Sequence, residues 1–213
     1  MIRRAVAALL APIALMAAAE AHTITFTDYR ASGPQLGGTF GGVGVTATAA
    51  TWTEDAFDAD TATGTGTPDL YGPLLDSGTI DTSRFGLASY SSFLDTSHQI
   101  DGFGLRDLVV FDFDEAVRLT GLTFSFVDAD DDFVLFVGDA NGALSAFRLL
   151  DVLAGGVALD VVGRSFGIGA FDASDDFKLT SLSFDAAPVP VPAAAPLFLA
   201  GLGLAAAARR KRA

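Results

Sequence analysis

Apolar and polar residues alternate with a period of two through much of the middle of this chain, which predicts β-strands. From Val109 to Phe113 the apolar positions alternate with Val110 and Asp112, the pattern of a half-buried strand. Phe133 to Val137 is apolar without interruption, which indicates a strand buried on both faces. Between the two ends of the chain no long helix is predicted.

The other predicted strands are separated by segments rich in Gly, Asp and Ser. They are expected at residues 22–27, 43–52, 117–126, 143–150, 157–162, 165–170 and 177–184. Residues 32–44 and 54–68 are expected to be loops and 114–116 a turn, while 71–104 carry no pattern that predicts an element. Residues 149–153 could instead close a short helical turn. The apolar phase switches at Gly121, as a bulge would produce.

Two pairs of segments repeat each other. Residues 117–124 (VRLTGLTF) match 177–184 (FKLTSLSF), and residues 128–133 (DADDDF) match 172–177 (DASDDF). The two offsets differ, so the repeats are not tandem and predict two similar strands and two similar turns in one domain. Many short strands with Gly and Asp turns favour an all-β fold, an antiparallel β-sandwich or jelly roll.

Residues 1–21 have the organisation of a secretory signal peptide. Arg3 and Arg4 precede an apolar run at residues 5–18, and Ala19 and Ala21 supply the small residues of an A-x-A cleavage site. We therefore expect cleavage before His22. An N-terminal transmembrane helix is the alternative, but the run is short for one.

The last 26 residues, 188–213, form a second targeting segment. A Pro-rich hinge precedes an uncharged apolar run at residues 193–208, and four basic residues follow. As a helix this run would span about 24 Å at roughly 1.5 Å per residue, and the hinge brings it close to a bilayer core of about 30 Å. The basic residues predict a cytoplasmic C-terminus. By hydropathy alone the segment is a plain C-terminal membrane anchor.

The three-part order of this tail resembles the VPLPA variant of the PEP-CTERM sorting signal, with Val191 where that variant usually has Leu. The resemblance implies an exported Gram-negative protein that a transmembrane helix holds in the inner membrane. An exosortase, a membrane protease-transpeptidase, would cut it near the Pro motif, and the product would reside at the cell surface or with extracellular polysaccharide. The residues that carry the resemblance are Val189, Pro190, Val191, Pro192, Ala193, Arg209, Arg210, Lys211 and Arg212.

Residues 22–187 remain as one predicted domain of 166 residues, enough for a sizeable core. This domain holds seven basic and 25 acidic residues, so its net charge is near −18. Such a charge repels phosphate backbones, and nucleic acid is not an expected partner. The chain has no Cys, which excludes a disulfide scaffold.

Signatures of catalysis are sparse in this domain. Ser97 and Asp95 are near His98 in the sequence, but no nucleophile motif surrounds them. Zinc is disfavoured because His and Cys ligands are scarce. A glycosidase needs only two carboxylates at a suitable separation, yet no acid stands out by apolar surroundings. We expect a protein that is not an enzyme.

The Asp clusters of the two repeated turns are the clearest chemical constellation. Their spacing begins like an EF-hand loop, but Phe133 stands where that loop requires Gly, so an EF-hand is rejected. Clustered carboxylates still suit calcium, and the alternative is a pair of solvated turns in which Asp serves turn chemistry. The candidate calcium ligands are Asp128, Asp130, Asp132, Asp175 and Asp176.

We therefore expect an exported, exosortase-sorted, non-enzymatic protein of the cell surface or extracellular matrix that either associates with glycan or serves a structural role. The alternative is a secreted hydrolase that acts on polysaccharide. Aromatic residues exposed on one face would favour glycan binding, and the candidates are Trp52, Tyr71 and Tyr90.

Overall fold

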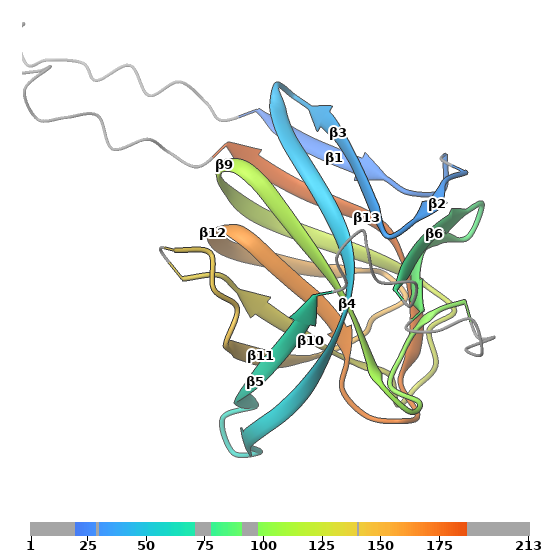
Figure 1. Ribbon diagram of the computed structural model, residues 1–213, viewed down its shortest axis with the longest axis vertical. Helices are drawn as coiled ribbons and strands as arrows, with labels where there is room; N and C mark the ends of the chain where they lie inside the picture. The colour runs from blue at the N-terminus through green and yellow to red at the C-terminus, as the bar shows by residue number, and fades with distance from the viewer. Residues whose placement is uncertain (1–19, 29, 71–77, 91–97, 140, 187–213) are drawn as a thin grey trace, which may run out of the picture. The chain divides into compact units, whose positions relative to one another are not determined.

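A computed structural model describes residues 20–28, 30–70, 78–90, 98–139 and 141–186, and within them it contains thirteen β-strands and no helix (Figure 1). Residues Glu20–Ala187 form one compact unit. The strands are β1 (Ala21–Thr25), β2 (Ser32–Gly33), β3 (Gln35–Phe40), β4 (Val43–Asp58), β5 (Thr63–Leu70), β6 (Thr79–Ser83), β7 (Gly86–Tyr90), β8 (Ile100–Asp101), β9 (Arg106–Ser125), β10 (Asp132–Val137), β11 (Ala146–Asp151), β12 (Val157–Ala170) and β13 (Asp176–Ala186).

A long antiparallel ribbon of β9 and β12 organises the sheet. Leu108 of β9 lies opposite Gly169 of β12, and Leu122 lies opposite Val157 near the other end. The second edge of β9 is shared by two partners, because residues 106–113 pair with β4 and residues 117–125 pair with β13. β3 extends the sheet beyond β4, and β1 extends it beyond β13.

Six of the strands are hydrogen-bonded in a closed circuit. β4 pairs with β9, β9 with β12, β12 with β10, β10 with β11, β11 with β5, and β5 returns to β4. The circuit can close because β4, β9 and β12 are long and strongly bent (Figure 1). It leaves none of these six strands as a free edge along its whole length.

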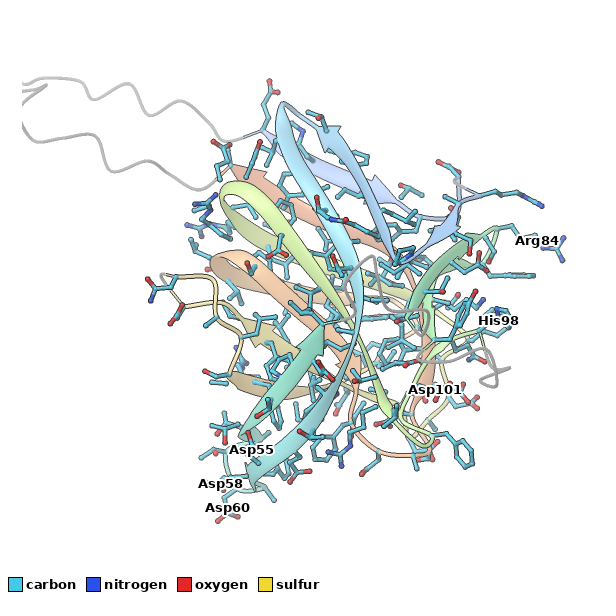
Figure 2. All side chains as sticks on the ribbon, viewed as in Figure 1. Asp55, Asp58, Asp60, Arg84, His98 and Asp101 are labelled. Atoms are coloured by element: carbon cyan, nitrogen blue, oxygen red, sulfur yellow. The ribbon has the colours of Figure 1, made fainter. Side chains whose placement is uncertain are left out.

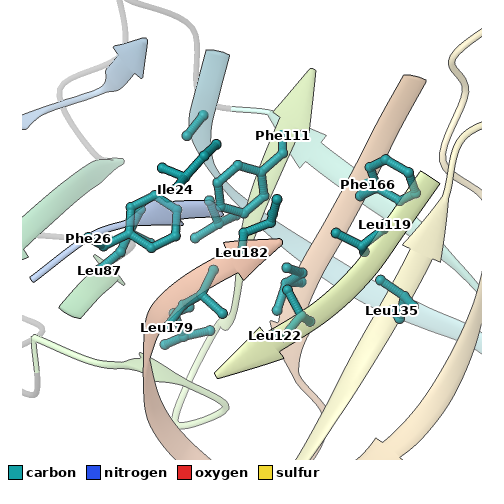
Figure 3. Close-up of a cluster of buried hydrophobic side chains, with 14 of the residues drawn as sticks. Ile24, Phe26, Leu87, Phe111, Leu119, Leu122, Leu135, Phe166, Leu179 and Leu182 are labelled. Carbon is teal, nitrogen blue, oxygen red and sulfur yellow. The ribbon is translucent and has the colours of Figure 1, made fainter. Parts of the chain in front are cut away.

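The main core contains 26 buried apolar side chains from both ends of the sequence. Ile24 and Phe26 from the first strand region meet Phe111 of β9 and Leu182 of β13 there (Figure 3). The predicted half-buried strand is confirmed in part: Val109, Phe111 and Phe113 belong to this core and Asp112 is exposed, but Val110 is buried as well. Burial of each large apolar side chain is worth about 1.5–3 kcal/mol, so this core is the main source of stability.

A second core, which we call the Trp52 core, comprises Ala50, Trp52, Leu108, Val110, Val134, Phe136, Phe147 and Phe171. These side chains come from the opposite faces of strands that also contribute to the main core. The rings of Phe136 and Phe147 meet Trp52 edge-on, at centroid distances of 5.4 and 5.1 Å. The Trp52 indole Nε1–H donates to the Ala170 carbonyl oxygen at 3.0 Å, which satisfies its buried polar group.

Burial on both faces confirms the prediction made for the apolar run at residues 133–137. Phe133 and Leu135 enter the main core, while Val134 and Phe136 enter the Trp52 core. All four side chains are at most 1% exposed. A run of apolar residues without alternation is what a strand between two cores requires.

The two predicted loops are corrected by the structure. Within 32–44, β3 pairs with β4 from Gln35 to Phe40. Within 54–68, β4 continues to Asp58 and β5 returns along it as a hairpin. Both segments lack apolar alternation because their side chains are largely exposed, and backbone pairing with β4 sustains the strands. Residues 78–90 and 100–101, for which no element was predicted, form β6, β7 and β8.

The bulge near Gly121 is confirmed, because the register of β9 against both β12 and β13 shifts beside that residue. The turn expected at 114–116 is not a break, since β9 runs through it. These residues do bulge, because the register jumps from Val117 opposite Gly163 to Asp112 opposite Ser165. Residues 149–151 belong to strand β11, which removes the helical alternative for them.

The all-β antiparallel class is confirmed. The finer assignment to a sandwich or jelly roll stays a prediction, because hydrogen-bonded pairing links all the strands into one continuous sheet. In the part of the chain that the structure describes, no helix reaches the length and hydrophobicity needed to cross a membrane. The predicted signal peptide up to Ala19 and the predicted tail helix lie outside the described residues. Ala21, the last residue of the predicted signal peptide, is described by the structure and is the first residue of β1, opposite Asp185.

Candidate functional site

The two repeated acidic turns meet in space, although the strands that follow them are not neighbours. The turn at 128–131 leads into β10 and the turn at 172–175 leads into β13, and β9 and β12 stand between those strands in the sheet. The first residues of β10 and β13 are nevertheless joined through the side chains of the opposite turn. We call this arrangement the Asp clasp, and it comprises residues 128–132 and 171–176.

Asp131 and Asp175 are the centres of the clasp. The Asp131 carboxylate accepts hydrogen bonds from the backbone N–H of Asp176 at 3.0 Å and of Asp128 at 2.5 Å. The Asp175 carboxylate accepts from Asp132 at 3.0 Å, and also from Phe171 at 3.0 Å and Asp172 at 2.5 Å. Each carboxylate thus accepts hydrogen bonds from the backbone of its own turn and from the first residue of the strand that follows the other turn. Asp131 is 3% exposed and Asp175 is 1% exposed.

The carboxylates around the clasp have perturbed acidities. Burial, followed by the charges of Asp175 and Asp151, raises the pKa of Asp132 to about 6. Asp151 stands directly opposite Asp132 in the β10–β11 pair, so two like charges face each other. Burial also raises the pKa of Asp175, although three backbone N–H groups oppose that shift.

Asp176 belongs to the same crowded end. Burial raises its pKa, a hydrogen bond from Gln99 at 2.7 Å opposes the shift, and the Asp131 charge adds to it. Asp101 lies opposite Asp176 in the β8–β13 pair, and its carboxylate accepts from the Phe103 N–H at 2.9 Å. The repeated turns therefore gather negative charge at one place.

The five predicted calcium ligands are brought to this place but not into a coordination sphere. Among the described residues no group of three or more His, Cys, Asp or Glu side chains is arranged to hold a metal ion. The carboxylate of Asp175 is occupied by backbone N–H groups. The Asp139 carboxylate accepts hydrogen bonds from the N–H groups of Asn141 and Ala143 and so closes its own turn.

Asp131 is the functional-looking residue that the sequence did not single out. It occupies the same place in DADDDF that Asp175 occupies in DASDDF, two residues before Phe. Comparing the repeats position by position is the signal that finds it. The runs of adjacent Asp conceal which carboxylate turns inward, because all of them have the same chemistry in the sequence.

The hydrogen bonds of the Asp clasp involve none of the other candidates that the structure describes. His98 lies exposed with a backbone φ of 49°, and its ring lies 4.9 Å from that of Tyr90 (Figure 2). Asp95, Ser97 and Tyr71 lie outside the described residues. Trp52 is only 2% exposed, so its expected role as a glycan-binding surface residue is wrong. Its side chain is instead the centre of a core.

Comparison with known proteins identifies the tail rather than the domain. No curated protein and no solved structure matches the chain. Residues 188–212 match the PEP-CTERM protein-sorting motif. These residues include all nine that carry the resemblance, and all lie outside the described part of the structure. The match supports an exported protein that is held at the membrane and sorted by an exosortase.

Proposed function

We propose that this chain is a non-enzymatic protein of the cell surface or extracellular matrix, which an exosortase releases by cutting at a VPLPA-type site. The observation that carries the proposal is the PEP-CTERM motif at 188–212. The domain that precedes it is an all-β unit with two aromatic-rich cores. The mature domain is delivered to a compartment where extracellular polysaccharide is the abundant partner, and we propose glycan association as its role.

Processing is tested through the hinge. Replacing Pro190 and Pro192 by Ala allows a helix to continue through the motif, because proline is what disfavours helix there. We expect export to continue and processing to stop, so immunoblots show a larger product than the parent gives. A chain that ends before Pro188 controls for export without the tail. The same mature mass in the Pro190→Ala, Pro192→Ala variant and in the parent would contradict the proposal.

The hydrolase alternative has one specific observation in its favour. The pKa of Asp132 is raised to about 6, which is a property of a general acid, and Asp151 stands opposite it. We expect no turnover when the full chain is incubated with polysaccharides. Hydrolysis that is lost in Asp132→Asn and retained in Asp130→Asn would replace our proposal by the hydrolase.

A further inference from the structure

Three of the seven basic residues of the domain gather around two exposed phenylalanines. We call this the Arg–Phe patch, and it comprises Arg30, Arg84, Phe85, Phe126 and Lys178. The guanidinium of Arg84 lies 4.5 Å from the centre of the Phe85 ring, and the ammonium of Lys178 lies 5.7 Å from that of Phe126. The two rings meet edge-on at 5.3 Å.

The patch is a built part of the fold rather than a set of unrelated surface residues. Arg84 and Phe85 form the turn between β6 and β7, and Phe126 follows the last residue of β9. The Ser125 hydroxyl donates to the Phe85 carbonyl oxygen at 2.5 Å and ties the turn to β9. Lys178 stands opposite Ser125 in the β13–β9 pair.

Phe126 is held exposed at a cost to the backbone. Its φ is 58°, in the left-handed region that a bulky residue rarely occupies, and half of its surface is exposed to solvent (50%). Phe85 is 41% exposed. Phe126 contacts the Phe85 ring but leaves half of its own surface in water, so the strained backbone gains only part of the burial that a core position would give, and strained residues concentrate at binding sites.

Beside Phe85 there is an open concavity of about 610 Å³. Arg30 and Arg84 line it together with Ser32, Ser83 and Asp81. In the described part of the chain the ion pairs are Arg106–Glu54 and Arg118–Asp160, and neither involves Arg30 or Arg84. The two guanidinium groups at the concavity are therefore available to a ligand. Arg84 projects outward into solvent there (Figure 2).

We propose that the Arg–Phe patch binds an acidic polysaccharide, one whose sugar rings carry carboxylates. Guanidinium groups bind carboxylates through paired, charge-assisted hydrogen bonds. The C–H face of a sugar packs on an aromatic ring, Ser hydroxyls can donate to or accept from sugar hydroxyls, and the Asp81 carboxylate accepts from them. Lys178 adds a positive charge beneath Phe126. The inference rests on the glycan association proposed above and gives it a site and a ligand class.

Charge argues for a localised anionic ligand at this position rather than for an anionic bilayer. The domain carries a net charge near −18, so an extended anionic surface would be repelled by most of it. A polymer chain needs to approach only the patch, because salt screening limits the reach of distant carboxylates to about 8–10 Å. Asp81 beside the concavity, and Asp128 and Asp176 two residues from Phe126 and Lys178, lie within that reach and oppose the binding of an anion.

The test measures binding of the full chain, purified in mild detergent, to three probes. These are polygalacturonate, neutral dextran and vesicles of phosphatidylglycerol. We expect binding to polygalacturonate that weakens with added salt, and much weaker binding to dextran and vesicles. Arg30→Gln with Arg84→Gln should weaken binding by at least about tenfold, because both charge-assisted contacts to the carboxylates are lost.

Two further variants separate binding from folding. Phe126→Gly removes the ring and the strained φ together, so it should weaken binding severalfold while its stability matches or exceeds that of the parent. Arg118→Gln makes the same change of charge on β9 at a residue outside the patch, where Arg118 pairs with Asp160, and should change binding less than twofold.

Equal binding of dextran and polygalacturonate, or no effect of the arginine pair beyond that of Arg118→Gln, would overturn the acidic-ligand site and leave glycan association standing. Binding to vesicles alone would replace the inference by a lipid-binding surface. If the protein bound neither polygalacturonate nor dextran, both the site and the proposed glycan role would be overturned.

Discussion

At the scale of single residues, Asp131 and Asp175 show how a carboxylate serves as a structural part. Each is buried, and each accepts backbone N–H groups from two chain segments about 45 residues apart in sequence. A carboxylate has two oxygens and about four lone pairs, so it can accept more N–H donors at once than an amide or hydroxyl oxygen, which has two lone pairs. The clasp therefore joins β10 and β13, which have no direct strand pairing.

Replacement of Asp175 by Ala should destabilise the fold by about 3 kcal/mol, because three backbone N–H groups lose their acceptor in a buried place. Urea unfolding followed by the fluorescence of Trp52, the single Trp, measures this. Asp130→Ala is the matched control, since Asp130 is an exposed neighbour, and should change stability by less than about 0.5 kcal/mol. Equal losses in the two variants would contradict a structural role for Asp175.

Asp132 predicts a pH dependence of stability. Its pKa in the folded state is about 6, above the ordinary 3.8, so the folded protein binds more protons than the unfolded chain between these values. Stability must then fall as the pH rises from about 4 to 6, and the loss is complete above the folded pKa.

Asp132→Asn removes this titration. It should stabilise the protein by about 1 kcal/mol at pH 7, a value reduced for the partial exposure of the side chain, and by much less at pH 4. Unfolding curves at the two pH values, with Asp60→Asn as the control for charge, provide the measurement. A gain in stability that is the same at pH 4 and pH 7 would exclude the mechanism.

At the scale of elements, the central strands are shaped by serving two cores at once. β4 sends Val45 and Ala47 into the main core and Ala50 and Trp52 into the Trp52 core. The closed circuit is narrow, and glycines on its strands make room for aromatic rings. A Cβ atom at Gly66 would lie 2.9 Å from the Trp52 ring, and one at Gly64 would overlap the ring of Phe147.

Gly64→Ala should destabilise the protein by about 2 kcal/mol, because the added methyl group collides with Phe147 and also with the backbone oxygen of Ala56. Gly155→Ala is the control, because that position is open and needs no positive φ. It should leave stability unchanged or raise it by up to about 1 kcal/mol. Thermal melts of both variants measure these changes in stability. If Gly64→Ala left the melting temperature unchanged, the Trp52 core would be loosely packed and the prediction would be wrong.

At the scale of the whole molecule, charge is distributed unevenly over an acidic domain. The Asp clasp concentrates carboxylates with raised pKa values, whereas the Arg–Phe patch concentrates three of the seven basic residues. Exposed carboxylates on the β4–β5 hairpin, among them Asp55, Asp58 and Asp60, lie far from Arg84 (Figure 2). Because the net charge of the domain is negative, an anionic ligand is not attracted at long range, and its binding depends on contacts at the patch itself.

Calcium should stabilise the protein through this charge, even though no ligand cage is formed in the described residues. A divalent ion beside Asp128, Asp130 and Asp132 relieves their mutual repulsion, and only millimolar affinity is expected. Melting temperatures should rise more in calcium than in sodium at equal ionic strength. The calcium response should disappear in Asp130→Asn with Asp132→Asn, and equal shifts in the two salts would assign the effect to screening alone.

Sequence pattern determined the strands whose side chains face a core. Period-two alternation marked β9, the uninterrupted apolar run marked β10, and repeated segments marked the two turns that meet. The targeting tail could also be recognised from the sequence, because its apolar run and basic cluster act through composition and order rather than through folding. Each of these signals is local, so the residues that carry it are contiguous in the chain.

Tertiary structure alone decided the rest. β3 and β5 carry almost no alternation and exist because β4 offers them backbone hydrogen bonds. The burial of Trp52 and the choice of Asp131 and Asp175 among many aspartates depend on which distant segments meet. So does the gathering of Arg30 and Arg84 beside Phe85 and of Lys178 beside Phe126. Pairing between residues far apart in sequence is set by closing the sheet around two cores, and no local pattern encodes that closure.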